Sequence, residues 1–304
     1  SVAVDPAGRF VYVTNFNGGN LSGYVIHPAT GALTGMGAPF AAGASPASVA
    51  VDPSGRFVYA ANYGGSSVSA YTINPATGAL VSAGPAVSTG GNPLSLAVDP
   101  FGRFVYTANQ TGNSVSAFTV HPTTGALTSA GASVPAGIQP HAVTVDPTGR
   151  FVYAANEGSD DVSAYTVHPS TGALTSVGPT AAAGDHPYGI TVDPAGRFAY
   201  VANYTPGSVS AYSIHATTGA LSSLGPALVA GLNPTSLVLY PSGTFGYAPN
   251  SASNDVSLFT IQPATGVIAA AGSMRARPGC WAAAIARGAS PLTHVPLHAY
   301  APNS

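Results

Sequence analysis

Acidic residues and histidines are concentrated in one stretch of the chain, residues 141–186. Apart from Asp146 and His168, whose positions recur in other repeats, its members are His141, Glu157, Asp160, Asp161, Asp185 and His186. Carboxylates bind Ca²⁺ or Mg²⁺ through hard oxygen ligands, and a carboxylate with an imidazole can act as a general acid–base pair. The candidate ligands of a divalent cation are Glu157, Asp160, Asp161 and Asp185. The candidate catalytic residues are His141, Glu157, Asp160 and His186. The alternative is a solvated hairpin, because residues 158–161, Gly-Ser-Asp-Asp, are also good turn sequence.

Most of the other charges belong to a repeated motif, D-P-x-G-R-F-x-Y. It begins at Asp5, Asp52, Asp99, Asp146 and Asp193, and a degenerate sixth copy begins at Tyr240. Successive copies are 47 residues apart, and an Asn follows each copy at a fixed distance. A feature that recurs in every repeat is expected to be scaffold, and a feature that differs at equivalent positions is a candidate for a site. We therefore expect the repeated Asp to cap a turn and the repeated Asn to be structural.

Each 47-residue repeat predicts four short strands. In the second repeat these are residues 48–51, 56–61, 67–73 and 79–82, with turn sequence between each pair. The second of these strands is apolar on both faces, as expected for a sheet packed between two neighbours. Four short strands per repeat are typical of one blade of a β-propeller. The repeats are 1–47, 48–94, 95–141, 142–188, 189–235 and 236–282, with a partial seventh at 283–304.

The sequence therefore predicts an all-β fold, a seven-bladed β-propeller in which residues 1–304 form a single domain and the seventh blade is incomplete. A two-stranded seventh blade would leave a strand edge exposed. We expect this edge to be covered by the segment 274–286, which contains Cys280 and Trp281, or to pair with a strand of another chain.

The repeats resemble those of known propellers. Residues 10–15, F-V-Y-V-T-N, resemble the YVTN repeat of surface-layer-type propellers, and the whole unit is similar to the seven-bladed lactonase family of the 6-phosphogluconolactonase type. The resemblance implies hydrolysis of a lactone. Pro140-His141 and Asp160 match two site positions of that family. Tyr188 and Tyr204 stand where the resemblance implies an Arg and a Glu, so a phosphorylated lactone would meet almost no positive charge here.

Binding sites of propellers usually lie at the axial mouth, which is formed by the loops before the first strand and after the second strand of each blade. The residues at these positions vary between the repeats and include several aromatics. We take the following as candidate ligand-binding residues: Phe16, Tyr63, Asn92, Gln139, Tyr188, Tyr204 and Asn233.

The amino-acid composition excludes several classes of protein. The 304 residues include 8 basic side chains, all of them Arg, and 10 acidic ones, which give a net charge of −2. This balance excludes a protein that binds nucleic acid by neutralising phosphates. No apolar run approaches the roughly 18 residues that span a membrane. The single Cys excludes an internal disulfide, and the start at Ser1 suggests a processed form or a fragment.

Two functions fit the sequence. The first is a binding or scaffold module whose mouth takes a carbohydrate, a peptide or a protein partner. The second is a lactonase-like hydrolase of a neutral sugar lactone, with a divalent cation as its cofactor if the acidic residues bind one. The low charge, the absence of Lys and the many Ser, Thr and Asn residues favour an extracellular or periplasmic location.

Overall fold

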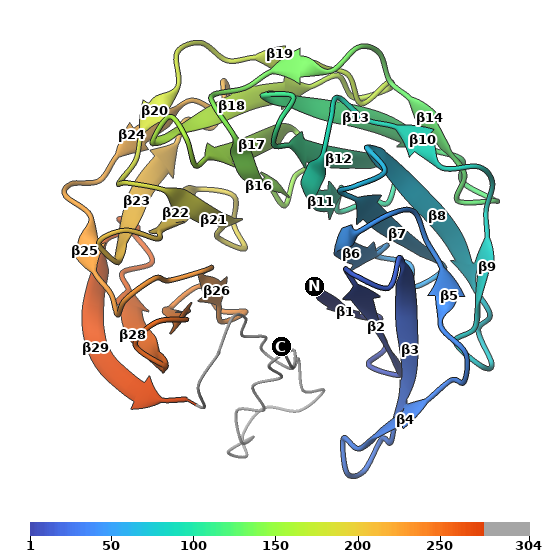
Figure 1. Ribbon diagram of the computed structural model, residues 1–304. Helices are drawn as coiled ribbons and strands as arrows, with labels where there is room; N and C mark the ends of the chain where they lie inside the picture. Colours follow the sequence, from blue (N-terminus) through green and yellow to red (C-terminus); the bar gives the residue numbers. More distant parts are fainter. Residues whose placement is uncertain (277–304) are drawn as a thin grey trace. The chain divides into compact units, whose positions relative to one another are not determined.

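The computed structural model of the protein describes residues 1–276, which form strands and turns (Figure 1). Within this range there is no helix, and so none that is long and apolar enough to cross a membrane. The strands form six antiparallel sheets, one for each predicted repeat, and the first four strands of each sheet pair in chain order. The predicted all-β fold built from repeated four-stranded sheets is confirmed.

The first three sheets follow the same order of strands. The first contains β1 (Val2–Val4), β2 (Phe10–Asn15), β3 (Asn20–Ile26), β4 (Leu33–Gly35) and β5 (Phe40–Ala41). The second contains β6 (Pro46–Val51), β7 (Phe57–Asn62), β8 (Ser67–Ile73), β9 (Leu80–Ser82) and β10 (Val87–Ser88). The third contains β11 (Pro93–Val98), β12 (Phe104–Asn109), β13 (Ser114–Val120), β14 (Leu127–Ser129) and β15 (Val134–Pro135).

The other three sheets repeat this order. The fourth contains β16 (Pro140–Val145), β17 (Phe151–Asn156), β18 (Asp161–Val167), β19 (Leu174–Ser176) and β20 (Ala181–Ala182). The fifth contains β21 (Pro187–Val192), β22 (Phe198–Asn203), β23 (Ser208–Ile214), β24 (Leu221–Ser223) and β25 (Leu228–Val229). The sixth contains β26 (Val238–Leu239), β27 (Phe245–Asn250), β28 (Asp255–Ile261) and β29 (Ile268–Arg275).

The outer strand is in two pieces in the first five sheets, whereas the sequence predicted a single one. In the second sheet, β9 pairs with one end of β8 and β10 pairs with the other end. Gly84 lies in the short gap between the two pieces, with a φ of 149°. In the sixth sheet β29 continues past the equivalent point through a bulge. The first strand also starts earlier than predicted, at Pro46 in the second sheet.

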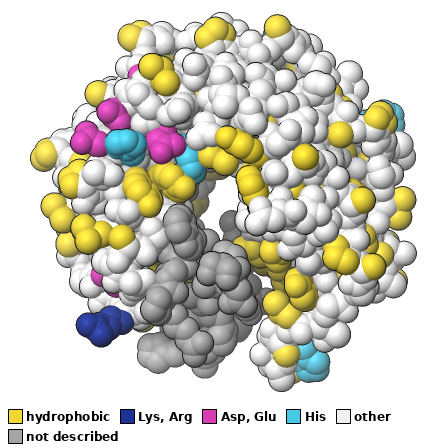
Figure 2. Space-filling view, in the orientation of Figure 1, with side chains coloured by type: hydrophobic (Ala, Val, Ile, Leu, Met, Phe, Trp, Pro, Cys, Tyr) yellow, Lys and Arg dark blue, Asp and Glu magenta, His cyan; other side chains and the backbone are white. Residues whose placement is uncertain are grey.

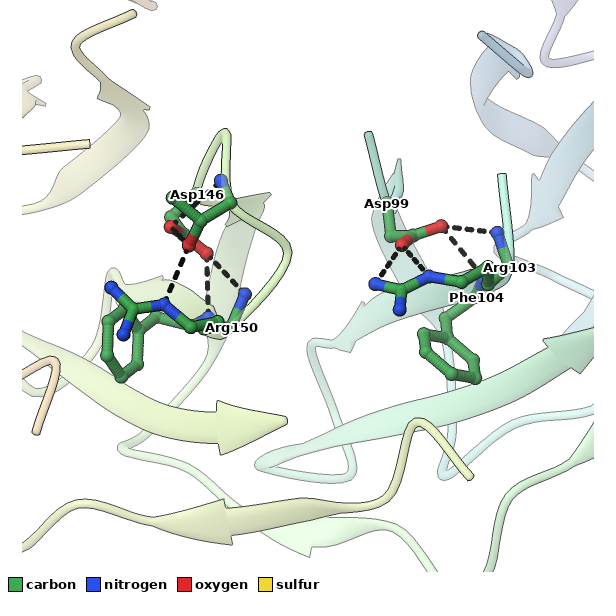
Figure 3. Close-up of polar contacts among 7 residues, drawn as sticks. Asp99, Arg103, Phe104, Asp146 and Arg150 are labelled. Atoms are coloured by element: carbon green, nitrogen blue, oxygen red, sulfur yellow. Dashed lines mark hydrogen bonds and ion pairs between the residues drawn. The ribbon is translucent and has the colours of Figure 1, made fainter. Parts of the chain in front are cut away.

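The repeated D-P-x-G-R motif forms the turn between the first two strands. Asp52 Oδ1 accepts hydrogen bonds of 2.7 Å from the backbone N–H groups of Arg56 and Phe57. Gly55 has a φ of 69°, and the guanidinium of Arg56 lies 4.8 Å from the centre of the Phe57 ring. Figure 3 shows the same arrangement in the third and fourth repeats. Because the carboxylate satisfies buried N–H groups, the predicted capping role of this Asp is confirmed.

The second strand of the second, third, fourth and fifth sheets is buried on both faces, as predicted. All six residues of β7 are buried, and Tyr59 is fully so. Phe57 and Tyr59 of the second sheet pack in one cluster with Val105 and Phe118 of the third sheet. Burial of each such side chain stabilises the fold by about 1.5–3 kcal/mol. The hydrophobic core of this part therefore lies between adjacent sheets.

The described chain divides into two compact units. The first comprises Ser1–Ala154 and Tyr165–Ser176, and the second comprises Ala155–Ala164 and the residues from Val177 onward. The division falls within the fourth sheet. Met274 and Arg275 belong to β29, whereas the rest of the segment 274–286 after residue 276 and the predicted partial seventh blade, 283–304, lie outside the described residues.

Candidate functional site

The repeated Asn at the end of the second strand is part of the scaffold, as predicted. In the fifth sheet, Asn203 Nδ2 donates to the hydroxyls of Ser208 at 3.0 Å and Ser210 at 2.9 Å, and its Oδ1 accepts from the N–H of Gly184. Asn203 is fully buried. These bonds tie the end of β22 to β23 and to the loop before β21, so the loop that carries residues 185–188 has a fixed anchor.

In the fourth repeat, Asp161 occupies the position that Ser208 has in the fifth repeat. Its Oδ1 accepts hydrogen bonds from Asn156 Nδ2 at 2.7 Å and from Ser159 Oγ at 2.9 Å, and its Oδ2 accepts one of 2.6 Å from Thr180 Oγ1. The equivalent position of the sixth repeat is Asp255, which accepts from Asn250 Nδ2. The carboxylate of Asp161 is therefore engaged in the scaffold through both oxygens.

Asp160 has a structural contact of its own. Its φ is 55°, and its Oδ1 accepts a hydrogen bond of 2.8 Å from the backbone N–H of His186. The third repeat has the same bond, from the N–H of Gln139 to Asn113 Oδ1, also at 2.8 Å. In the second repeat, Ser66 Oγ accepts from the N–H of Asn92 at 3.1 Å. A neutral side chain can thus make this contact, and the charge of Asp160 is not required for it.

The predicted set of cation ligands is not brought together. Among residues 1–276 no three side chains of His, Cys, Asp or Glu lie close enough to share a metal ion. Asp161 is engaged through both oxygens, and Asp160 bonds the main chain, while Asp185 is exposed. Asp160 and Asp161 therefore already have hydrogen-bond donors within the scaffold, which disfavours their sharing a Ca²⁺ or Mg²⁺ ion with Glu157 and Asp185.

An aromatic pair lies beside an acid in the second unit. The rings of Tyr188, in β21, and Tyr204, just after β22, are stacked with their centres 5.0 Å apart and an interplanar angle of 27°. Burial raises the pKa of the Tyr188 phenol, and the negative charge of Glu157 and the neighbouring Tyr204 raise it further. Tyr188 therefore stays protonated at neutral pH and can donate a hydrogen bond next to a carboxylate.

The position of this pair follows from the local fold. Pro187 pairs with Asn203 across β21 and β22, with a bulge immediately after Pro187. The N–H of Tyr204 donates to the carbonyl of His186 at 2.8 Å. These contacts hold the loop before β21 against the loop after β22. Tyr188 follows the first of these loops and Tyr204 begins the second, so the two tyrosines are adjacent. Figure 2 shows that acidic and imidazole side chains gather on one face of the molecule, with hydrophobic side chains near them.

The first unit contains a second set of candidate residues, which are the aromatic row of Phe16 and Tyr63 together with Asn92. Phe16, which is 46% exposed, has its ring centre 6.0 Å from that of Tyr63. The Tyr63 hydroxyl donates to Gln110 Oε1 at 3.0 Å. Asn92 is engaged at both ends of its amide, because Nδ2 donates to the carbonyl of Tyr63 and Oδ1 accepts from Thr111 Oγ1. Phe16 and Tyr63 offer an aromatic surface, and Asn92 supports it.

The other candidates are placed as follows. His141, at the start of β16, is half-buried and belongs to the first unit, as does the exposed Gln139 before it. His186 is exposed. Asn233 accepts hydrogen bonds at its backbone carbonyl from the N–H and the hydroxyl of Ser251. Of the four candidate catalytic residues, the second unit contains Glu157, Asp160 and His186.

The structural role of Asp160 could have been predicted from the residue types at the equivalent position of the other repeats. Two repeat positions have a left-handed backbone, and residues that tolerate positive φ occupy them. At the first position the residues are Gly19, Ser66, Asn113, Asp160, Gly207 and Asn254. At the second they are Ser45, Asn92, Gln139, His186 and Asn233. The composition of the first position is itself typical of such turns.

Comparison with known proteins agrees with this architecture. The family model described as "Lactonase, 7-bladed beta-propeller" matches residues 36–144, 137–231 and 189–282. No curated protein matches the chain. A crystal structure from Bacteroides uniformis, described provisionally as a 6-phosphogluconolactonase, is 23% identical with a TM-score of 0.78, over 90% of this chain and 84% of that one. The periplasmic gluconolactonase of Pseudomonas aeruginosa is 20% identical with a TM-score of 0.76, over 91% and 85%. These likenesses show the fold.

Proposed function

Since the chain belongs to the lactonase family of seven-bladed β-propellers, we propose that it is a lactonase whose substrate is an uncharged sugar lactone. The observation that carries the proposal is the stacked pair of Tyr188 and Tyr204 beside Glu157. These two residues stand where the resemblance to the family implies an Arg and a Glu. A pair of neutral phenols offers a ring-shaped ligand an aromatic face and hydrogen bonds, but no charge to hold a phosphate.

The chemistry needs one acid–base group and one hydrogen-bond donor. Glu157 accepts a proton from a water molecule as the water oxygen attacks the lactone carbonyl carbon. The Tyr188 hydroxyl donates a hydrogen bond to the carbonyl oxygen, which becomes negative in the transition state. The bond from the carbonyl carbon to the ring oxygen then breaks, and the ring oxygen receives the proton from Glu157. One lactone and one water give one hydroxy acid.

Two properties of Tyr188 suit this role. Its raised pKa keeps the phenol protonated at neutral pH, so that it remains a donor. The ring of Tyr204 restricts its orientation by stacking on it. An oriented donor costs little reorganisation when charge develops on the carbonyl oxygen. The stacked rings also offer an apolar surface against which a sugar ring can lie.

A neutral lactone is also consistent with the comparisons. One structural relative is described as a gluconolactonase, and gluconolactone carries no phosphate. Among the basic side chains of the repeated turns, Arg9, Arg103 and Arg197 pair with the Asp of their own turn. We extend the proposal to an extracellular or periplasmic location, which the low charge and the absence of Lys favour.

The proposal is tested by following acid release from D-glucono-1,5-lactone, above its spontaneous hydrolysis, with Glu157→Gln and Tyr188→Phe. Removal of the base should lower kcat about 100-fold or more. Loss of the Tyr188 hydroxyl should lower kcat about 10- to 100-fold with little change in KM. A matched control is His121→Asn, which creates at an exposed turn the residue that Asn74 already provides at the equivalent position.

Equal activity in the wild type and Glu157→Gln would contradict the proposed base. Absence of any activity above the spontaneous rate, in a chain with a cooperative unfolding transition, would contradict the lactonase function. In that case a binding role of the aromatic residues becomes the better explanation, and lactone binding without turnover would show it.

A further inference from the structure

A pocket of about 340 Å³ lies in the first unit between the D-P-x-G-R turns of the second and third sheets. Its wall includes Arg56, Phe101, Arg103 and Pro122. These turns precede the strands β7 and β12, whereas Tyr63 and Gln110 follow the same strands. The pocket is therefore at the opposite end of six-residue strands, roughly 20 Å from the aromatic row that contains Tyr63.

Phe101 is the residue of this pocket that the repeat does not explain. It occupies the variable position of the D-P-x-G-R motif, where every other copy has a small residue: Ala7, Ser54, Thr148, Ala195 and Ser242. The Phe101 side chain is 63% exposed. An exposed phenylalanine in a turn that otherwise takes Ala, Ser or Thr is not needed for the turn, so its ring is free to serve a ligand.

The orientation of Phe101 is held by its neighbours. The guanidinium of Arg103 lies 4.8 Å from the centre of the Phe101 ring and 5.0 Å from that of Phe104. Arg103 is fixed in turn by its ion pair with Asp99, at 2.8 Å. A fixed aromatic ring at the wall of a pocket loses little entropy when a ligand stacks on it. Figure 3 shows Arg103 between the carboxylate of Asp99 and the ring of Phe104.

Arg56 faces the same pocket with an unused donor. In the turn that contains Arg56, Ser54 bridges Asp52 and Arg56. The Ser54 hydroxyl donates to Asp52, and Arg56 Nε donates to Ser54 Oγ at 3.0 Å. Arg56 Nη2 donates to the carbonyl of Pro122 at 2.9 Å. Within residues 1–276, Nη1 has no protein acceptor. The fixed guanidinium can therefore donate to a ligand, and the hydroxyl of Ser170 lines the same pocket.

Each positive charge at the pocket is accompanied by a negative one. Arg56 is accompanied by the buried carboxylate of Asp52, and Arg103 by that of Asp99. A balanced site does not favour an anion over a neutral molecule. An aromatic ring, an oriented guanidinium donor and a hydroxyl are instead complementary to a molecule with one apolar face and several hydroxyl groups. The volume is at the lower end of the range for small-molecule sites, which suits one or two sugar rings.

We propose that this pocket binds a neutral carbohydrate, with the C–H face of a pyranose ring against Phe101 and ring hydroxyls on Arg56 Nη1 and Ser170. The site is separate from the tyrosine pair of the proposed lactonase and does not depend on that activity. Its ligand contacts come from a single non-repeated ring, from the Arg of one repeated turn, and from Ser170 in the turn between β18 and β19.

The test is saturation-transfer NMR on the full chain with methyl glycosides of glucose, galactose and mannose, and with cellobiose and maltose. We expect at least one of these to bind in the millimolar range, with transfer strongest at ring C–H protons. Phe101→Ser should weaken that binding by about tenfold or more, because it removes the ring. The variant restores the residue found at the equivalent Ser54 and Ser242, so the turn is expected to fold.

Three comparisons decide the result. Phe101→Tyr should retain binding, since it keeps the aromatic face, and Tyr204→Ala should leave it unchanged, since that ring lies in the other proposed site. If Phe101→Ser binds as well as the wild type while Tyr204→Ala does not, the sugar occupies the tyrosine pair and the inference is wrong. It is equally overturned if none of the panel binds, or if glucuronate binds more than tenfold better than the neutral glycosides.

Discussion

The carboxylate of Asp160 accepts a hydrogen bond of 2.8 Å from the backbone N–H of His186, 26 residues further along the chain. Asn113 makes the same bond to Gln139 one repeat earlier. The bond joins the loop after β17 to the loop before β21, and the Asp160 backbone is left-handed, with φ of 55°. An acid that attracts a catalytic interpretation from sequence thus has a defined structural role.

This relationship predicts a contrast between two variants. Asp160→Asn keeps both the acceptor and the tolerance for positive φ, so the free energy of unfolding should be unchanged. Asp160→Val loses the hydrogen bond, about 1 kcal/mol, and adds about 1–2 kcal/mol of backbone strain. Urea denaturation measures both. If Asp160→Asn is as destabilised as Asp160→Val, the carboxylate charge itself stabilises this loop.

The repeated tyrosine of the second strand gives a second contrast. The Tyr12 hydroxyl donates to the carbonyl of Gly78 in the next repeat at 2.7 Å, and Tyr200 bonds Gly266 likewise at 3.0 Å. The buried hydroxyl of Tyr106 has no partner among the described residues. Tyr12→Phe should cost about 1 kcal/mol of unfolding free energy, whereas Tyr106→Phe should be neutral or stabilising. Similar losses in both variants would show that the Tyr106 hydroxyl is hydrogen-bonded in solution.

Alkaline pH should unfold the protein through the same tyrosines. Burial, and next the nearby turn carboxylate, raise the pKa of Tyr12, Tyr59, Tyr106, Tyr153 and Tyr200 above the ordinary value. The unfolded chain therefore loses these protons first, and stability is complete below a pH of about 10 and falls above it, by up to about 1.4 kcal/mol per tyrosine per pH unit.

Urea unfolding at a series of pH values, with tyrosinate absorbance followed in parallel, checks this dependence. Tyrosinate should appear together with unfolding. Ionisation of most tyrosines in a chain that stays folded at the same pH would contradict the burial argument.

Divalent cations should have no effect on stability. In the described part of the chain no three potential ligands converge, and Asp161 already accepts three hydrogen bonds. A cation in 100-fold excess over its Kd would raise stability by about 2.7 kcal/mol. We expect no rise in Tm with Ca²⁺, Mg²⁺ or Zn²⁺, and no loss of lactone hydrolysis with a chelator. A rise that Asp161→Ser abolishes would restore the metal site.

The fold was largely predictable because the 47-residue period places the same turn and the same apolar strands in every repeat. Asp52 and Asn203 were identified as scaffold from recurrence alone. The break in the outer strand was missed, because the hydrophobic pattern of the sequence does not mark where pairing with β8 stops and resumes.

The candidate site was predictable only in part. Tyr188 and Tyr204 were selected as varied aromatics, but their stacking depends on how Pro187 pairs with Asn203 and could not be read from sequence. The structural hydrogen bonds of Asp160 and Asp161 were not predicted, although Ser, Asn and Gly residues occupy the equivalent positions of other repeats. Phe101 was not among the candidate residues, although it differs from the small residues at the equivalent position of every other turn.

Whether the tyrosine pair binds an uncharged lactone is measured by the ratio of kcat/KM for D-glucono-1,5-lactone to that for its 6-phosphate. We expect a ratio above one in the wild type and a loss of both activities in Glu157→Gln. The ratio should fall in Tyr188→Arg, which supplies a cation for the phosphate. A wild-type preference for the phosphorylated lactone, or a Tyr188→Arg variant with an unchanged ratio, would contradict the proposed binding of an uncharged lactone.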